Sequence, residues 1–258
     1  MSLLEAIILG LIQGLSEFLP VSSSGHLMVF HELFGITTQD NLTFIIVLNM
    51  GSLIPLLFVF RKDVWALIKR PFQKTTLLLI IATIPLILAT LLFEDFIENS
   101  FFTVQFLPFG FILTGVALLL SDRLKSNKKN MDKIGILDAA LVGCMQALAV
   151  IPGISRSGST ITMTMARGFN REAAAKFSFL MSIPTAVGAI FFRATRIMAS
   201  PELLENLNFV NLAAGFITAA VSGYIAINFM LKLIKNANLK FFMYYIIALV
   251  VVIFVFLW

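Results

Sequence analysis

The segment Gln13–His26 reads Gln-Gly-Leu-Ser-Glu-Phe-Leu-Pro-Val-Ser-Ser-Ser-Gly-His and places a polar break inside an apolar stretch. Only about ten apolar residues follow it before Gly35. A second break, Pro-Gly-Ile-Ser-Arg-Ser-Gly-Ser-Thr, occupies residues 152–160. Neither Ser2–Asn41 nor Ile134–Ala173 is long enough for two crossings of a bilayer, since each crossing needs about 20 apolar residues. We therefore expect both segments to be re-entrant helical hairpins.

The composition around these breaks is that of an integral membrane protein. Hydrophobic residues make up 59% of the 258 residues, 13% are charged, and the mean hydropathy is +0.96, whereas a soluble domain is about 25% charged. The net charge is +5, but no Lys or Arg precedes Arg61, and the basic residues cluster in short connectors. This pattern indicates membrane topology and argues against a nucleic-acid partner. Without an early basic residue, we expect no cleaved signal peptide.

Six further stretches are apolar over about 17 to 25 residues, the length that crosses a bilayer as a helix. They are Thr43–Phe60, Thr76–Phe93, Phe101–Leu120, Ala174–Phe192, Phe209–Leu231 and Phe241–Trp258. The connectors 61–74, 121–133 and 232–240 are rich in Lys and Arg, so we expect them to face the cytoplasm. An acidic loop at 94–98 and a second loop at 202–205 are expected on the outside.

The two broken segments are copies of one another. A shift of 133 positions superimposes them without a gap, with eight identities within 22 positions. Leu4, Ala6, Gly10, Gln13, Leu15, Ser22, Ser24 and Gly25 fall on Leu137, Ala139, Gly143, Gln146, Leu148, Ser155, Ser157 and Gly158. Three predicted spans separate the copies, so the second enters the membrane from the opposite side. The prediction is an all-α polytopic membrane protein: one domain, 1–258, with six transmembrane helices, two re-entrant hairpins and inverted-topology repeats at about 2–125 and 135–258.

Inverted repeats with broken helices place a polar site near the bilayer midplane, where the breaks meet. Because unpaired backbone groups are costly in lipid, the breaks must enclose something polar. Their polar side chains are Gln13, Glu17, Ser22, Ser23, Ser24 and His26 in the first, and Gln146, Ser155, Arg156, Ser157, Ser159 and Thr160 in the second. Gly25, Gly153 and Gly158 allow tight turns, and the helix starts direct N–H groups inward. The set favours an anion, especially phosphate.

Arg156 and Glu17 are the charged members of this set. A guanidinium inside a membrane is costly unless paired or hydrated, and its fork matches two phosphate oxygens; a structural ion pair with Glu17 is the alternative. Glu17 shares a helix face with Gln13. It is a candidate ligand for a divalent cation shared with phosphate, a candidate general base, or a cap for nearby amides. Gln13 and Gln146 alternatively join helices by hydrogen bonds.

His26 follows three serines closely. It is a candidate acid or base, or the group that activates one of these serines as a nucleophile. A histidine after a glycine at a helix start is also commonly a hydrogen-bonded cap, and the serines themselves are candidate helix caps. The spacing alone leaves these alternatives open.

The two breaks resemble the two signature motifs of the BacA-type undecaprenyl-diphosphate phosphatases. The likeness rests on Gln13–His26 and Pro152–Thr160 and extends nearly end to end, including Arg171–Pro184. The resemblance implies a multi-pass enzyme of the bacterial inner membrane that removes the terminal phosphate of the C55 carrier lipid, which is used to build peptidoglycan. It also implies a link to bacitracin resistance and an active site that opens to the external side.

Carried over by position, the resemblance assigns roles to individual residues. Catalytic roles fall to Ser23 as nucleophile, His26 as acid or base, Glu17 in the acidic motif and Arg156 as phosphate clamp. Substrate binding falls to Gln13, Ser22, Ser24, Gly25, Gly153, Ser155, Ser157, Gly158 and Thr160. The first position of the acidic motif is Gln13, so a single Mg²⁺ or Ca²⁺ held by Glu17 and the diphosphate fits better than a scheme with two carboxylates. Undecaprenyl diphosphate and membrane lipids are the implied partners, and a homodimer is left open.

A transporter is the alternative from another class, because inverted repeats with broken helices are typical of carriers. An isoprenoid phosphate flippase is its natural form, and phosphate release distinguishes the two. The acid-phosphatase type of lipid phosphatase shares a Ser-Gly-His string but requires a second histidine, and none follows His31. The sequence does not decide which of Ser22, Ser23 and Ser24 attacks, or whether water attacks directly.

Overall fold

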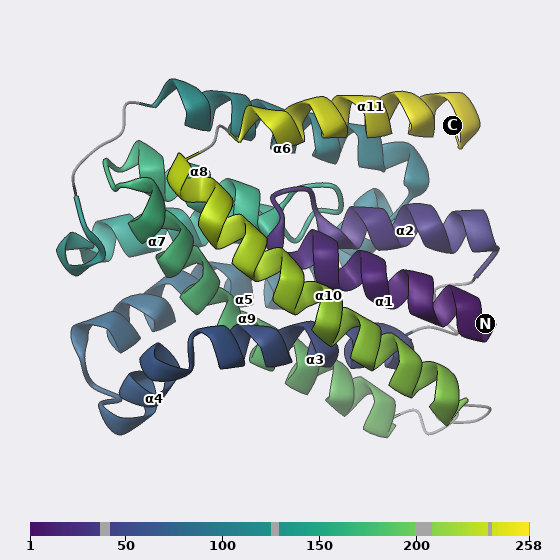
Figure 1. The fold of residues 1–258 in the computed structure, drawn as a ribbon, viewed down its shortest axis with the longest axis horizontal. Helices are drawn as coiled ribbons and strands as arrows, with labels where there is room; N and C mark the ends of the chain where they lie inside the picture. Colours follow the sequence, from purple (N-terminus) through teal and green to yellow (C-terminus); the bar gives the residue numbers. More distant parts are fainter. Residues whose placement is uncertain (37–41, 125–128, 200–207, 237–238, 258) are drawn as a thin grey trace.

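The computed structural model describes residues 1–36, 42–124, 129–199, 208–236 and 239–257. Within these ranges the chain is almost wholly helical, and the one β-type pairing is an isolated bridge between Lys129 and Phe169. The α-helices (Figure 1) are α1 (Leu3–Phe18), α2 (Ser23–Phe34), α3 (Leu42–Val59), α4 (Arg61–Lys69), α5 (Lys74–Phe101), α6 (Leu107–Arg123), α7 (Ile136–Leu148), α8 (Arg156–Ala166), α9 (Arg171–Ala199), α10 (Phe209–Asn236) and α11 (Lys240–Phe256). Short 3-10 turns, η2 (Val104–Phe106) and η3 (Met131–Lys133), precede α6 and α7.

Both predicted breaks are present. α1 ends before Pro20, which disfavours helix in the residue ahead of it, and α2 starts after Ser22, whose hydroxyl accepts the N–H of Gly25 at 3.4 Å. The second break repeats this cap, because Ser155 accepts the N–H of Gly158 at 3.1 Å. The serines that start each second helix therefore satisfy N–H groups that a helix start leaves open.

Several helices are long and apolar enough to cross a membrane. They are the stretches Lys74–Phe93, Val104–Arg123, Arg171–Thr195 and Phe209–Lys235, with α3 and α4 as a fifth candidate bent by 85° at their junction. α7 and α11 are shorter apolar helices. The chain is thus an all-helical, multi-pass membrane protein.

Two segments that we expected to be loops are helical. Residues 61–69 form α4, and α5 runs through the acidic positions 94–98 to Phe101. No Gly or Pro interrupts the chain between Leu86 and Phe101, so nothing in the backbone stops α5 earlier. The loop expected at 202–205 lies outside the described residues.

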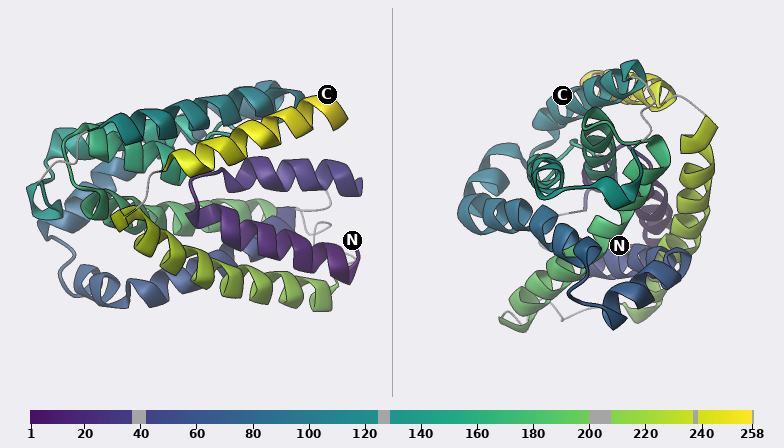
Figure 2. Two further views of the ribbon diagram at one scale, coloured as in Figure 1. Left: turned by 45° about the horizontal axis from the view of Figure 1, so that its top comes forward. Right: turned by 90° about the vertical axis from the view of Figure 1, so that its left-hand side faces the viewer.

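Small residues hold each broken hairpin against a long helix. α1 packs on α10, where a Cβ added at Gly10 would lie 2.5 Å from the carbonyl oxygen of Gly215. α7 packs on α5 in the same way, since a Cβ at Gly143 would clash with the carbonyl oxygen of Ala82. Backbones approach this closely only where side chains are minimal. Figure 2 shows α6 and α11 running side by side over the hairpins.

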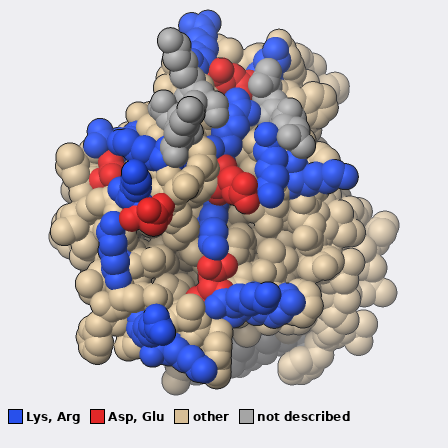
Figure 3. Space-filling model, turned by 60° about the vertical axis from the view of Figure 1, so that its left-hand side comes forward, with Lys and Arg blue, Asp and Glu red and all other residues tan. Residues whose placement is uncertain are grey.

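Lysine and arginine side chains gather at one end of the bundle (Figure 3). The described parts of the connectors 61–74, 121–133 and 232–240, predicted to share one side of the membrane, lie at this end in Figure 1. Ion pairs join them to the start of α9: Lys176 contacts Asp63 at 2.7 Å, and Arg171 contacts Asp122 at 3.4 Å. α5 and α9 both begin at this basic end.

Candidate active site

The two breaks lie against each other inside the bundle. The hydroxyl of Ser157 donates to the carbonyl oxygen of Leu19 at 3.1 Å, which joins the second break to the first. A Cβ at Gly25 would lie 3.1 Å from the Cα of Gly153, so the glycines permit this close approach. Side chains 130 or so positions apart in the sequence are thereby brought to one place.

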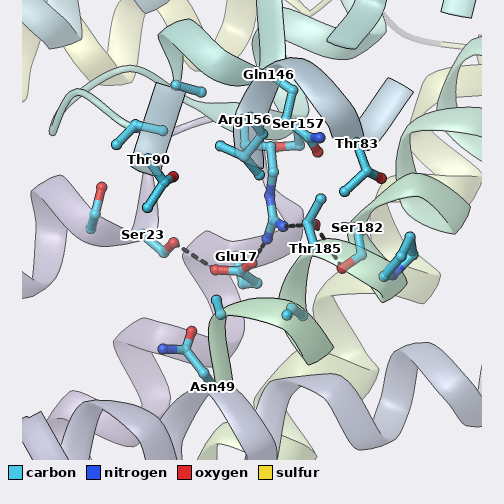
Figure 4. A pocket seen from close by; sticks show the side chains of 18 of the residues that line it. Glu17, Ser23, Asn49, Thr83, Thr90, Gln146, Arg156, Ser157, Ser182 and Thr185 are labelled. Atoms are coloured by element: carbon cyan, nitrogen blue, oxygen red, sulfur yellow. Dashed lines mark hydrogen bonds and ion pairs between the residues drawn. The ribbon is translucent and has the colours of Figure 1, made fainter. Parts of the chain in front are cut away.

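A cavity of about 880 Å³ opens beside the joined breaks, between α3, α5 and α9 (Figure 4). Its polar lining residues are Glu17, Ser22, Ser23, Ser24, Asn49, Ser52, Thr83, Thr90, Gln146, Arg156, Ser157, Ser178, Ser182, Thr185 and Arg193. The remainder of its wall is mainly apolar. The volume falls in the range of about 300–1,000 Å³ that is typical of sites for small ligands.

Arg156 and Glu17 form an ion pair at this cavity. One guanidinium nitrogen, Nη2, donates to Glu17 Oε1, and Nη1 donates to Thr185 Oγ1 at 2.8 Å. The side chains are 27% and 12% exposed, respectively. The ion pair that the sequence offered as an alternative therefore exists, but it lines a cavity and is not sealed in the protein interior. A guanidinium so placed is also accessible to a phosphate group.

Ser23 shares the same carboxylate. Its Oγ donates to Glu17 Oε2 at 2.6 Å (Figure 4). Ser22 caps α2 and contacts Ser24 at 3.4 Å, so among the three serines Ser23 is the one bonded to a carboxylate. A hydroxyl next to a base is the arrangement of an activated nucleophile.

Gln13 lies behind Glu17 and does not line the cavity. Its Nε2 donates to Glu17 Oε2 at 3.2 Å and to Asn49 Oδ1 at 3.1 Å, with Ser52 Oγ at 3.4 Å. The amide is 1% exposed. Gln13 thus orients the carboxylate that holds Ser23 and Arg156.

His26 points away from the cavity. Its Nδ1 lies 2.7 Å from the carbonyl oxygen of Ser22, and its Nε2 lies 2.7 Å from the hydroxyl of Tyr245 on α11. The ring stacks on Tyr245 and meets the edge of Phe111 at centroid distances of 5.7 and 5.5 Å. It is 5% exposed. In this geometry Glu17, rather than His26, contacts the hydroxyl of Ser23.

Most predicted members of the second break support the backbone that carries Arg156. Thr160 donates to the carbonyl oxygen of Arg156 at 2.8 Å. Thr114, on α6, donates to the carbonyl oxygen of Gly153 and accepts the N–H of Ser155, both at 2.8 Å. Gly153 has φ +86°, a conformation that favours glycine. Gly25, Gly153, Ser155, Gly158 and Thr160 do not line the cavity, whereas Ser157 does.

Four polar residues that complete the site were not predicted from the sequence. Asn49, Thr114 and Thr185 interrupt apolar spans, and a polar residue in such a span is the signal that was available. Tyr245 contacts a residue 219 positions away, and no local pattern indicates that contact. Each of the four is hydrogen-bonded to a residue of one of the two breaks.

The lining residues provide one carboxylate, Glu17. Within the described chain, no group of three or more His, Cys, Asp or Glu side chains could hold a metal ion. Gln146 also lines the cavity, and its Oε1 is buried with no hydrogen-bond partner in the described structure. One carboxylate and neutral oxygens fit Mg²⁺ or Ca²⁺ when substrate phosphates complete the coordination.

Fold and site together define a multi-pass helical membrane protein with an acid, a hydroxyl and a guanidinium at the junction of two broken helices. A family model described as "Bacitracin resistance protein BacA" matches residues 6–252. The chain belongs to the BacA family.

Relatives named undecaprenyl-diphosphatase match along nearly the whole chain. The protein from Carboxydothermus hydrogenoformans is 44% identical over 246 residues, covering 95% of this chain and 94% of the relative. That from Halothermothrix orenii is 41% identical over 247 residues, with 95% and 94% coverage. Undecaprenyl-diphosphatase 4 of Bacillus thuringiensis is 41% identical over 253 residues, with 98% and 96% coverage.

Proposed function

We infer that this chain is an undecaprenyl-diphosphatase, a hydrolase that converts undecaprenyl diphosphate to undecaprenyl phosphate and inorganic phosphate. Its relatives carry that name over nearly the full length, and they give no support to a flippase. The observation that carries the inference is the hydrogen bond from Ser23 to Glu17 beside the guanidinium of Arg156. A transporter site needs to bind phosphate, but it does not need a hydroxyl bonded to a base.

Arg156 supplies the charge that a diphosphate requires. When the terminal phosphoryl group enters, its oxygens compete with Glu17 for the guanidinium, which is already within reach of the cavity. The starts of α2 and α8 add N–H groups and a positive dipole end at the same place. Donors fixed before the reaction stabilise charge that develops in the transition state.

Ser23 acts as the nucleophile in the route we propose. Its proton passes to Glu17 as Oγ attacks the terminal phosphorus, the bond from that phosphorus to the bridging oxygen breaks, and undecaprenyl phosphate leaves. Water then hydrolyses the phosphoserine, releases inorganic phosphate and restores the hydroxyl. Direct attack by a water that Glu17 deprotonates uses the same groups. Ser23→Ala separates the routes, because it abolishes the covalent one and spares the other.

Glu17 and the diphosphate would hold a divalent cation, Mg²⁺ or Ca²⁺. The cation would neutralise charge on the phosphate oxygens. The single lining carboxylate and the unpartnered Oε1 of Gln146 support this proposal. Glu17 also remains bonded to Gln13, which keeps its carboxylate oriented.

We further propose the inverted repeat as the architecture of the domain 1–258, with repeats at about 2–125 and 135–258. Helix bounds support it: the shift of 133 carries Leu107–Arg123 onto Lys240–Phe256, the bounds of α6 and α11. Packing supports it as well. The same shift carries Gly10 onto Gly143 and Ala82 onto Gly215, so the contact of Gly10 with Gly215 corresponds to that of Gly143 with Ala82. Six transmembrane helices and two re-entrant hairpins follow from this arrangement.

The same proposal places the protein in the bacterial inner membrane, with its basic end in the cytoplasm and its site open to the external leaflet. The gathering of Lys and Arg at one end supports the orientation. α5 and α9 begin at that end, and the apolar part of the cavity lies farther along both helices. A lipid substrate would therefore reach the site from the opposite leaflet.

Phosphate release from undecaprenyl diphosphate by purified protein tests the function, with Mg²⁺, with Ca²⁺ and with EDTA. We expect cation-dependent release that falls by at least about a hundredfold in Arg156→Ala and Glu17→Ala, since donors and bases of this kind contribute factors of that size. Val251→Ala, on the exposed face of α11, is the matched control.

Thermal unfolding of each variant establishes that lost activity is not lost structure. Wild-type rates in folded Arg156→Ala or Glu17→Ala would contradict the proposed site. Absence of release by the folded wild type, with lipid binding retained, would favour the flippase instead. Release that EDTA leaves unchanged would remove the cation from the proposal and leave the phosphatase intact.

A further inference from the structure

The cavity continues beyond the polar cluster as an apolar groove between α5 and α9. Along α9 its wall changes from Ser182 and Thr185 to Gly188 and Ala189. Along α5 it includes Leu86, Ile87 and Leu91. The cavity is therefore charged at Glu17 and Arg156 and again at Arg193, near the far end of α9, and the stretch of wall between them is suited to hydrocarbon.

The apolar stretch reaches the outer surface of the bundle. Ile87, Leu91 and Phe191 line the cavity and are 49%, 64% and 72% exposed, respectively. In a membrane-spanning bundle, such exposed apolar side chains contact lipid chains. The groove thus connects the site of Glu17 and Arg156 to the hydrocarbon of the membrane.

The groove that the repeat relates to this one is closed. The shift of 133 relates the pair α5 and α9 to the pair α10 and α3. There, a Cβ added at Gly51 would lie 2.6 Å from the carbonyl oxygen of Phe216, so α3 and α10 are in backbone contact. The residues related to Phe216 and Gly51 are Thr83 on α5 and Pro184 on α9, and both line the cavity. One turn farther along α9, a Cβ added at Gly188 would meet no atom within 4 Å. Of the two related helix pairs, α3 and α10 are in contact, whereas α5 and α9 are separated by the cavity that contains the polar site.

We propose that the groove between α5 and α9 binds the first isoprene units of the polyprenyl chain while the diphosphate occupies the polar end. This rests on the proposed function. The cavity is the size of a site for a small ligand, so a C55 chain cannot be contained in it. The rest of the chain passes between Leu91 and Phe191 into the lipid.

The groove contributes alignment more than affinity. A prenyl chain already lies in hydrocarbon before it binds, so moving it into an apolar groove removes little surface from water. Holding its first units fixes the direction from which the diphosphate meets Ser23, and such positioning raises the rate of reaction. The groove therefore makes hydrolysis depend on a chain that is long enough to occupy it.

Gly188→Phe tests the groove because it places a ring in open space. Hydrolysis of undecaprenyl diphosphate is compared with that of isopentenyl diphosphate, whose five-carbon chain ends near the head group. We expect kcat/KM to fall at least fivefold more for the C55 substrate than for the C5 substrate. Val187→Phe is the matched control: this neighbour is 50% exposed and does not line the cavity, so the ratio between substrates should stay at the wild-type value.

A photoreactive substrate provides a second measurement that does not depend on a variant. A diazirine on the second isoprene unit of a diphosphate lipid should label peptides of α5 and α9 in the wild-type protein. Labelling of α3 and α10, or equal losses for both substrates in Gly188→Phe, would overturn the groove. If the wild type hydrolyses neither substrate, the proposed function fails, and the labelled helices still decide the groove.

Discussion

Glu17 has three partners for its two carboxylate oxygens. Oε1 accepts from Arg156, while Oε2 accepts from Ser23 and from Gln13. A phosphate that draws Arg156 away frees Oε1 but leaves the oxygen that faces Ser23 unchanged. The ion pair is therefore compatible with catalysis, because the guanidinium and the base can change partners without a movement of Ser23.

His26 has a different role in this geometry. We expect His26→Asn to keep kcat within about tenfold of the wild type, since an Asn side chain can still donate to the carbonyl oxygen of Ser22 and a neutral hydrogen bond is worth about 1 kcal/mol. We expect His26→Ala to lose about a further factor of ten, because the carbonyl oxygen of Ser22 then keeps the backbone N–H of residue 26 at 3.2 Å but loses the ring, and the hydroxyl of Tyr245 loses its contact with Nε2. Phosphate release between about pH 5 and pH 9 measures both.

The shape of the pH profile identifies the role. If His26 orients the first break through Ser22, the Asn variant keeps both limbs of the wild-type profile at a lower rate, and Tyr245→Phe has a similar effect. Loss of one limb in His26→Asn, with activity as low as in His26→Ala, would instead establish His26 as the acid or base that the sequence suggested.

The residue types of the site could be predicted, but their contacts could not. Ser23, Glu17 and Arg156 stand out because a charge or a run of hydroxyls inside a membrane requires a partner. Which oxygen each one meets depends on how the breaks pack, and this is set by residues such as Thr114 that lie far away in the sequence. Proximity in sequence suggested a pairing of His26 with the serines, yet the helix start turns its ring toward α11.

α4 is the element whose form the sequence analysis did not predict. The run of basic residues suggested a solvated loop, but Trp65 and Ile68, 58% and 64% exposed, recur on a helix beside Arg61 and Lys69. Lys69 lies 5.2 Å from the centre of the Trp65 ring. Charge alone does not separate a loop from an amphipathic helix, whereas the recurrence of apolar residues does. The breaks were easier to predict because Pro, Gly and Ser mark them directly.

We expect α4 to lie in the membrane interface. It is bent by 85° from α3, and its apolar and basic residues suit the boundary between headgroups and chains. In a Trp258→Phe background Trp65 is the single tryptophan. Its fluorescence should be quenched more strongly by lipids brominated near the headgroup than by lipids brominated near the chain end.

Equal quenching at both depths, or none in vesicles that contain the protein, would place α4 elsewhere. Val64→Trp in a chain that lacks both native tryptophans serves as the control, because Val64 lies on the partly buried side of the helix and packs against the core. Its fluorescence should be less sensitive to the bromine position.

At the scale of the whole molecule, the closest helix pairs join the two halves of the chain. α1 packs on α10, α7 on α5, and α6 on α11, so each hairpin is held by a helix from the other half. The repeat itself could be inferred from the shift of 133, but its asymmetry could not. The sequence does not show that α3 and α10 are in backbone contact at Gly51 while the related position on α9, Pro184, lines the cavity, because that difference arises from how the helices pack.

This arrangement predicts the behaviour of a chain cut between α6 and η3. Each fragment alone should lack a stable fold and activity, because its hairpin has lost the helix that covers it. Co-expressed fragments should associate and release phosphate at a measurable fraction of the intact rate. Association without activity, or activity from one fragment alone, would contradict an interlocked pair of halves.

The ion pair between Glu17 and Arg156 has a consequence for how the molecule tolerates change. The position related to Glu17 is Val150, and the position related to Arg156 is Ser23. The protein is thus comparable to an obligate heterodimer whose two subunits are fused into one chain. One half contributes the carboxylate and the hydroxyl, and the other contributes the guanidinium. The fold is repeated but the charged residues of the site are not. A substitution of Glu17 or Arg156 therefore cannot be compensated by the related residue in the other half.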